Sequence, residues 1–173
     1  TLTLEGVGAL LIHMALAGGP MGGEGLPFFA LFHSISAFCN AGFSTLSQGL
    51  ADPRVSTHVP FLVVIMTLIV LGGLGFPVVK GFFLYVRDHL RYRLRFTRRV
   101  PERLSANNRI VLVTTFFLLV GGTLAIWNTE FGLGSGPRAG SSWVTALFHS
   151  VTARTAGFSI TEVRAMMPAT IFL

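Results

Sequence analysis

The chain has 173 residues and a formal net charge of +6; 51% of its residues are hydrophobic and only 12% are charged. Soluble domains carry about a quarter charged residues, so this chain has too little charge to cover the surface of an ordinary soluble protein. The composition therefore predicts a membrane protein.

The first expected element is an apolar helix from Leu2 to Ala17, which begins without an initiator Met. The last apolar stretch, Met166 to Leu173, covers about half of a membrane span. We therefore interpret the sequence as part of a longer polypeptide, with no signal peptide at its start.

A short apolar run follows, from Phe28 to Phe38. As a helix its 11 residues would be roughly 16 Å long, too short to cross a bilayer, yet the run is too apolar for an exposed loop. We expect a re-entrant helix that starts near Pro27, enters the membrane from outside and ends at the turn Asn40 to Phe43. The C-terminal end of such a helix carries partial negative charge, which stabilises a desolvated cation.

Twenty residues without charge, from Pro60 to Val79, predict a helix that spans the membrane. Small residues and a proline near its end leave two alternatives open, a hinge within the span or a surface that packs closely against a neighbouring helix. These residues are Gly72, Gly73, Gly75 and Pro77.

A strongly basic connection comes next. This connection and its flanks hold nine of the 13 Lys and Arg residues: Lys80, Arg87, Arg91, Arg93, Arg95, Arg98, Arg99, Arg103 and Arg109. By the positive-inside bias, we expect residues 87–107 to be cytoplasmic. Arginines interleaved with aromatic residues also suit nucleic acid, but a short loop between spans carries such charge for topology and for contact with lipid head groups. We therefore expect no nucleic-acid partner.

A second span is predicted from Ile110 to Trp127, where 18 residues carry no charge. A second short apolar run, Trp143 to Ala153, follows it, with Ser141 or Ser142 as a candidate N-cap. Like the first run, it is too short to cross a bilayer.

The two short runs belong to copies of one unit. The segment from Ala30 to Ser44 recurs as Ala146 to Ser159, with 10 identities over 14 aligned positions. The spacing predicts a repeat of two spans with a re-entrant helix between them, as in a pore-loop channel. We expect an all-α membrane protein in which residues 1–86 form one repeat, residues 87–107 the connection and residues 108–173 the start of another repeat.

Each run ends in Ala-Gly-Phe. Gly42 and Gly157 allow turns in which successive carbonyl oxygens face one side and replace the water around an ion, while the following Phe packs behind the turn. The expected ion ligands are the backbone carbonyls of Cys39, Asn40, Ala41, Gly42, Arg154, Thr155, Ala156 and Gly157, supported by Phe43 and Phe158.

Other polar residues near the turns have structural interpretations. Cys39 is the only cysteine, so no internal disulfide exists. We interpret His33 and His149 as hydrogen-bonded helix residues and expect no transition metal. Arg154 takes the place of Phe38, and a buried cation there must be paired; a structural role is favoured over tuning of ion occupancy. The spans supply no paired carboxylates and no Gly-x-Ser-x-Gly motif, so we expect no enzyme.

These motifs resemble the Trk/Ktr/HKT superfamily of potassium transporters. The segment from Phe32 to Phe43 is similar to the second pore loop of that family, and Ser150 to Phe158 is similar to the third. The segment from Gly72 to Pro77 resembles the helix after the second loop. The resemblance implies four span-loop-span repeats around one ion path, of which the first and fourth lie outside this sequence.

The resemblance also implies K⁺ uptake across the cell inner membrane by a multi-pass membrane subunit, with no cofactor besides the transported ion. Sodium or mixed-cation transport and a non-conducting scaffold are the alternatives, because the first loop, where sodium-selecting relatives carry Ser, is absent. In the family a homodimer sits on a cytoplasmic ring of nucleotide-binding regulatory subunits. We therefore expect a homodimer and such a subunit as partners, besides the lipid bilayer.

Overall fold

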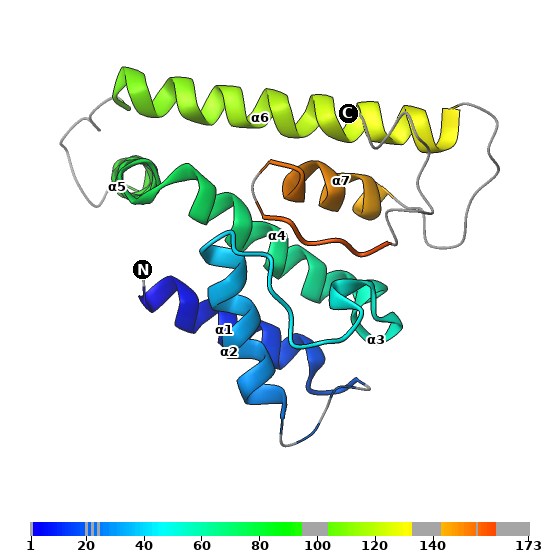
Figure 1. Cartoon of the computed structure of the whole chain (residues 1–173). Helices are drawn as coiled ribbons and strands as arrows, with labels where there is room; N and C mark the ends of the chain where they lie inside the picture. The colour runs from blue at the N-terminus through cyan, green and yellow to red at the C-terminus, as the bar shows by residue number, and fades with distance from the viewer. Residues whose placement is uncertain are drawn as a thin grey trace. The chain divides into compact units, whose positions relative to one another are not determined.

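The computed structural model describes residues 2–19, 21, 23, 25–94, 104–132, 143–154 and 156–161. Within these ranges the regular structure is helical and no strand occurs (Figure 1). The helices are α1 (Leu2–Leu16), α2 (Leu26–Phe38), the 3₁₀ turn η1 (Gly49–Ala51), α3 (Pro53–Ser56), α4 (Val59–Leu74), α5 (Phe76–Arg93), α6 (Ala106–Trp127), the π-helical turn η2 (Asn128–Gly132) and α7 (Trp143–Thr152). The predicted all-α fold is confirmed.

The chain divides into two compact units. The first unit comprises residues 1–73 and 119–173, and the second comprises residues 74–118. The core of the first unit brings together apolar side chains from α1, α2, α4 and α7, most of them fully buried. They include Ile12, Leu16, Phe29, Ala30, Phe61, Ile65, Phe148 and Val151.

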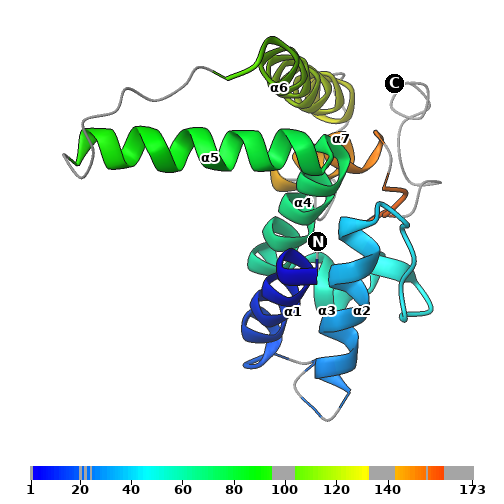
Figure 2. The ribbon, with the colours of Figure 1, turned by 90° about the vertical axis from the view of Figure 1, so that its left-hand side faces the viewer.

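Helices α1 and α2 of the first unit pack side by side (Figures 1 and 2). Helix α2 begins with Pro27 in its first turn, where the missing N–H costs no helical hydrogen bond. The predicted short helices are both present, since α2 ends at Phe38 and α7 ends at Thr152. Residues 141 and 142, the candidate cap of α7, lie outside the described residues.

The helix predicted to span the membrane from Pro60 to Val79 is not continuous, because it is interrupted at Gly75. Gly75 has φ +78, a left-handed conformation that glycine adopts without a steric penalty, and Pro77, which has no backbone N–H, lies in the first turn of α5. A run without charge reveals how apolar a segment is but not where its backbone leaves the helix. The sequence left open a hinge or close helix packing in this segment, and both occur. The helix breaks at Gly75, and another part of the chain packs closely against Gly72.

Helix α6 meets the other span prediction. Together with the π-helical turn it forms an apolar segment, Ala106–Glu130, long enough to cross a membrane by length and composition. Helices α4 and α5 pass the same test when taken together as one broken span, whereas α1 and α2 are shorter apolar helices.

The second unit consists of α5 and the first half of α6. The Gly81 backbone lies against the side-chain amide of Asn108, so the two helices approach closely there. Helix α5 continues into the basic connection, where Arg87 and Asp88 form an exposed ion pair at 2.9 Å. The arginines at 95, 98, 99 and 103 lie outside the described residues.

Candidate functional site

The first turn, residues 39–44, follows α2 directly. Asn40 N–H donates to Ala37 O at 3.1 Å, and Ala41 N–H donates to Ser36 O at 2.9 Å. Asn40 has φ +52 and Gly42 has φ +73. Asparagine and glycine tolerate this left-handed backbone better than other residues, so the sequence permits the chain to leave the helix at this point.

His33 of α2 braces the first turn. In the neutral ring, Nδ1–H donates to the carbonyl of Phe29 at 2.9 Å, and Nε2 accepts from the hydroxyl of Ser44 at 2.9 Å. The Ser44 oxygen in turn accepts the Leu46 N–H at 3.1 Å. Both ring nitrogens of His33 are thus engaged in hydrogen bonds, as the interpretation of a hydrogen-bonded helix residue requires.

The second turn, residues 153–159, repeats part of this arrangement; its Thr155 lies outside the described residues. Ala156 N–H donates to Thr152 O at 3.1 Å, and Gly157 has φ +68. Nε2 of His149 is 3.0 Å from the hydroxyl oxygen of Thr161. In both copies, therefore, a histidine of the short helix binds a hydroxyl, that of Ser44 at the end of the first turn and that of Thr161 just beyond the second.

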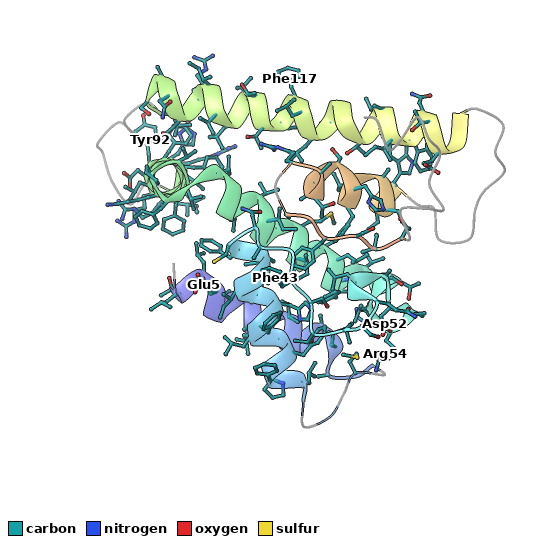
Figure 3. The ribbon with its side chains drawn as sticks, viewed as in Figure 1. Glu5, Phe43, Asp52, Arg54, Tyr92 and Phe117 are labelled. Carbon is teal, nitrogen blue, oxygen red and sulfur yellow. The ribbon has the colours of Figure 1, made fainter. Side chains whose placement is uncertain are left out.

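The two turns lie against each other. A Cβ added to Gly42 would collide with the carbonyl oxygen of Ala156, whereas a Cβ on Gly157 would meet no atom within 4 Å. Phe158 is only 4% exposed, but Phe43, which we expected to pack behind the first turn, is 70% exposed (Figure 3). The carbonyl of Phe43, rather than its ring, contacts α2, because it accepts the Ser36 hydroxyl at 2.8 Å.

Ser34 anchors α2 to the preceding helix. Its hydroxyl donates to Glu5 O in α1 at 2.6 Å, and a Cβ on Gly8 would lie 2.5 Å from the same hydroxyl oxygen. Ser34 is fully buried, so its hydroxyl requires this partner. The absence of a side chain at Gly8 therefore gives α2 its close approach to α1.

The same anchor recurs in the second copy. Ser150 of α7 donates to Leu119 O in α6 at 3.0 Å, and a Cβ on Gly122 would lie 2.5 Å from the Ser150 hydroxyl oxygen. Glu5 and Gly8 each lie 114 residues before their counterparts. In both copies, therefore, a serine of the short helix binds a carbonyl of the preceding helix beside a glycine.

Comparison with known proteins places this sequence in a family. Residues 20–173 match the family model TrkH, described as a cation transport protein. The chain belongs to the TrkH family. It is 36% identical over 154 residues to Ktr system potassium uptake protein B of Vibrio alginolyticus, covering 83% of this chain and 29% of that protein.

Two further relatives of this TrkH-family chain have similar coverage. Potassium/sodium uptake protein NtpJ of Enterococcus hirae is 30% identical over 155 residues, which are 84% of this chain and 30% of that protein. Ktr system potassium uptake protein B of Bacillus subtilis is 30% identical over 179 residues, 99% of this chain and 36% of that protein. The chain thus spans about a third of the length of these relatives, and its family is one of cation transport proteins.

The structure brings the two turns of this TrkH-family chain together at Gly42 and Ala156. The described residues of both turns belong to the first unit, where Gly42 contacts Ala156. Cys39 is a free, exposed thiol, and Arg154 is exposed rather than buried as expected, since it follows the end of α7 on the surface of the described chain. Sequence reasoning missed Ser34 and Ser150, whose only signal was their identity between the copies.

Proposed function

We propose that this chain is part of a transporter that takes up K⁺ across the cell membrane through backbone carbonyls of its two turns. The observation that carries the proposal is the contact of Gly42 with Ala156, which sets two left-handed glycine turns from two repeats beside each other. A cation freed from water needs several oxygen ligands at once, and no single turn supplies them from all sides. The ligands are the carbonyls of residues 39–42 and 154–157, and residues 1–86 and 108–173 belong to two of four repeats.

Residue types at the turns support carbonyl ligation. Apart from Arg154 the turns carry no charged side chain, and α2 and α7 both end where the turns begin, so each helix presents its partial negative charge to its own turn. Sodium is the second candidate ion, because NtpJ of Enterococcus hirae is named a potassium/sodium uptake protein.

The test is ion flux. The full-length protein that contains this sequence should carry K⁺ into liposomes, and Na⁺ in competition should reveal its preference. K⁺ flux with a preference over Na⁺ supports the proposal; equal flux of both ions would favour the mixed-cation alternative. If the protein inserts fully into the liposome membrane and carries neither ion, the result would favour the alternative of a non-conducting scaffold.

Orientation and partners complete the proposal. Residues 87–107 are cytoplasmic, and the protein is a multi-pass homodimer in the cell inner membrane whose basic connection contacts lipid and an acidic face of a nucleotide-binding regulatory subunit. A cysteine introduced at Thr97 should resist an impermeant thiol reagent added outside intact cells. Replacing Arg95, Arg98 and Arg99 by Gln should weaken co-purification with that subunit in a salt-dependent manner.

A further inference from the structure

The side chain of Asn40 points away from its own turn and onto α4. In the amide orientation that satisfies both of its polar atoms, Nδ2 donates to Ile69 O at 3.3 Å and Oδ1 accepts from Gly73 N–H at 3.1 Å. Ile69 and Gly73 are four residues apart, so their backbone groups are a pair that an α-helix joins directly. The amide of Asn40 thus engages both members of one hydrogen-bond pair of α4.

A second contact beside it depends on Gly72. A Cβ at this position would collide with the carbonyl oxygen of Phe38 and would lie 3.2 Å from the side-chain amide of Asn40. The end of α2 therefore rests on α4 at a site that admits no side chain. Two independent features, the amide of Asn40 and the bare backbone of Gly72, hold the start of the first turn on α4.

We propose that Asn40 is a positioning residue, whose amide fixes the start of the first turn to α4 and thereby sets where the carbonyls of this turn stand. The inference rests on the proposed function, in which those carbonyls bind the ion. From the sequence, only the backbone carbonyl of Asn40 was expected to contribute, as an ion ligand; here its side chain has a role as well.

The geometry separates this role from simple stabilisation of α4. If the amide is removed, the Ile69 carbonyl and the Gly73 N–H can still bond to each other, so α4 keeps its hydrogen bonds. The turn has no such substitute, because the amide of Asn40 is what joins it to α4 at this point. Loss of the amide should therefore disturb the ion preference more than the stability.

The cleanest variant is Asn40→Gly, which removes the amide but accepts φ +52 without strain. Gly72→Ala disturbs the same contact from the opposite side. Two controls match them: Gln48→Ala removes an amide from an exposed position in the following loop, and Gly121→Ala adds a methyl group to a helical glycine with no atom within 4 Å. All are made in the full-length protein.

The measurements are the half-saturating K⁺ concentration, the maximal rate, the K⁺ over Na⁺ preference in liposomes and the melting temperature. For Asn40→Gly and Gly72→Ala we expect the half-saturating concentration to rise about tenfold and the preference to fall, because the carbonyls of the first turn are displaced. The melting temperatures of Asn40→Gly and of both controls should stay near that of the wild type.

Each outcome decides the matter. Wild-type preference and half-saturation in Asn40→Gly would overturn the positioning role while leaving the proposed function intact. If Asn40→Gly does not fold, Asn40→Asp replaces it, since Asp keeps the acceptor for Gly73 N–H and loses the donor to Ile69 O; failure of both to fold would make the residue structural and overturn the inference. A wild-type protein that carries no K⁺ would overturn the proposed function and the inference together.

Discussion

The two copies of the repeat agree where their helices meet and differ where their turns meet. In the first copy Ser34 binds Glu5 O beside Gly8, and in the second Ser150 binds Leu119 O beside Gly122. His33 of α2 binds the Ser44 hydroxyl at the end of the first turn, and His149 of α7 binds the Thr161 hydroxyl just beyond the second. The anchors that fix a short helix against the preceding helix are thus the same in both copies, although the surrounding sequence is not.

The turns are not equivalent. Gly42 is packed against Ala156 O, while Gly157 faces open space; Phe158 is buried, while Phe43 is exposed. The short helices of the two copies are therefore held by the same serine contacts, whereas each turn packs against different neighbours. Equal sequence motifs therefore need not tolerate equal substitutions.

The largest effect is expected at Gly42. An added methyl group at either Gly42 or Gly157 forces an L-residue into left-handed backbone, at about 1–2 kcal/mol. Gly42→Ala adds a collision with the Ala156 carbonyl oxygen. This oxygen belongs to the backbone, so no side-chain rotation can relieve the collision. Gly42→Ala should therefore lower the melting temperature and the K⁺ over Na⁺ preference of the full-length protein much more than Gly157→Ala. Similar losses in both variants would show that the two turns do not touch.

The helices and their ends could largely be predicted from the apolar runs and from the glycine-containing turns that follow them. The runs ending at Phe38 and Ala153 end within one residue of α2 and α7, because a Gly-containing turn follows each of them. The break at Gly75 could not be located, since Gly72 and Gly75 look alike in sequence and only one adopts positive φ. The side chain of Asn40 was also missed, because its partners lie some 30 residues away on a helix whose placement the sequence does not give.

Substitutions at the glycines beside Ser34 and Ser150 should lower the stability by an intermediate amount. They test whether these two contacts are equivalent in the two copies. Gly8→Ala and Gly122→Ala each place a methyl group 2.5 Å from a serine oxygen, and such overpacking costs about 1–3 kcal/mol. Gly6→Ala and Gly121→Ala are matched controls in the same helices, since a Cβ at these positions meets no atom within 4 Å. We expect thermal unfolding to separate each anchor variant from its control. An anchor variant as stable as its control would break the equivalence of the two copies.

The smallest effect is expected for the interaction of Asp52 with Arg54, which follows the first turn and does not belong to the repeated motif. Asp52 caps α3 by accepting Arg54 N–H at 3.0 Å, and it pairs with the Arg54 guanidinium at 2.7 Å (Figure 3). The hydrogen bonds from Arg54 lower the pKa of Asp52 from 3.8 to about 2. A lowered pKa means that the ionised carboxylate stabilises the fold above pH 3.8, and that this contribution is lost as the pH falls through about 2.

Asp52→Asn is the variant that isolates the charge, because Asn still accepts a hydrogen bond at an N-cap. The guanidinium of Arg54 is half exposed, so the pair is screened by water and the effect on stability should be small. We expect the melting temperature of the full-length wild type to exceed that of Asp52→Asn slightly at pH 5, and the difference to shrink below pH 3.8 and disappear near pH 2. A difference that stays constant over this range would show that the ion pair with Arg54 does not stabilise the loop after the first turn.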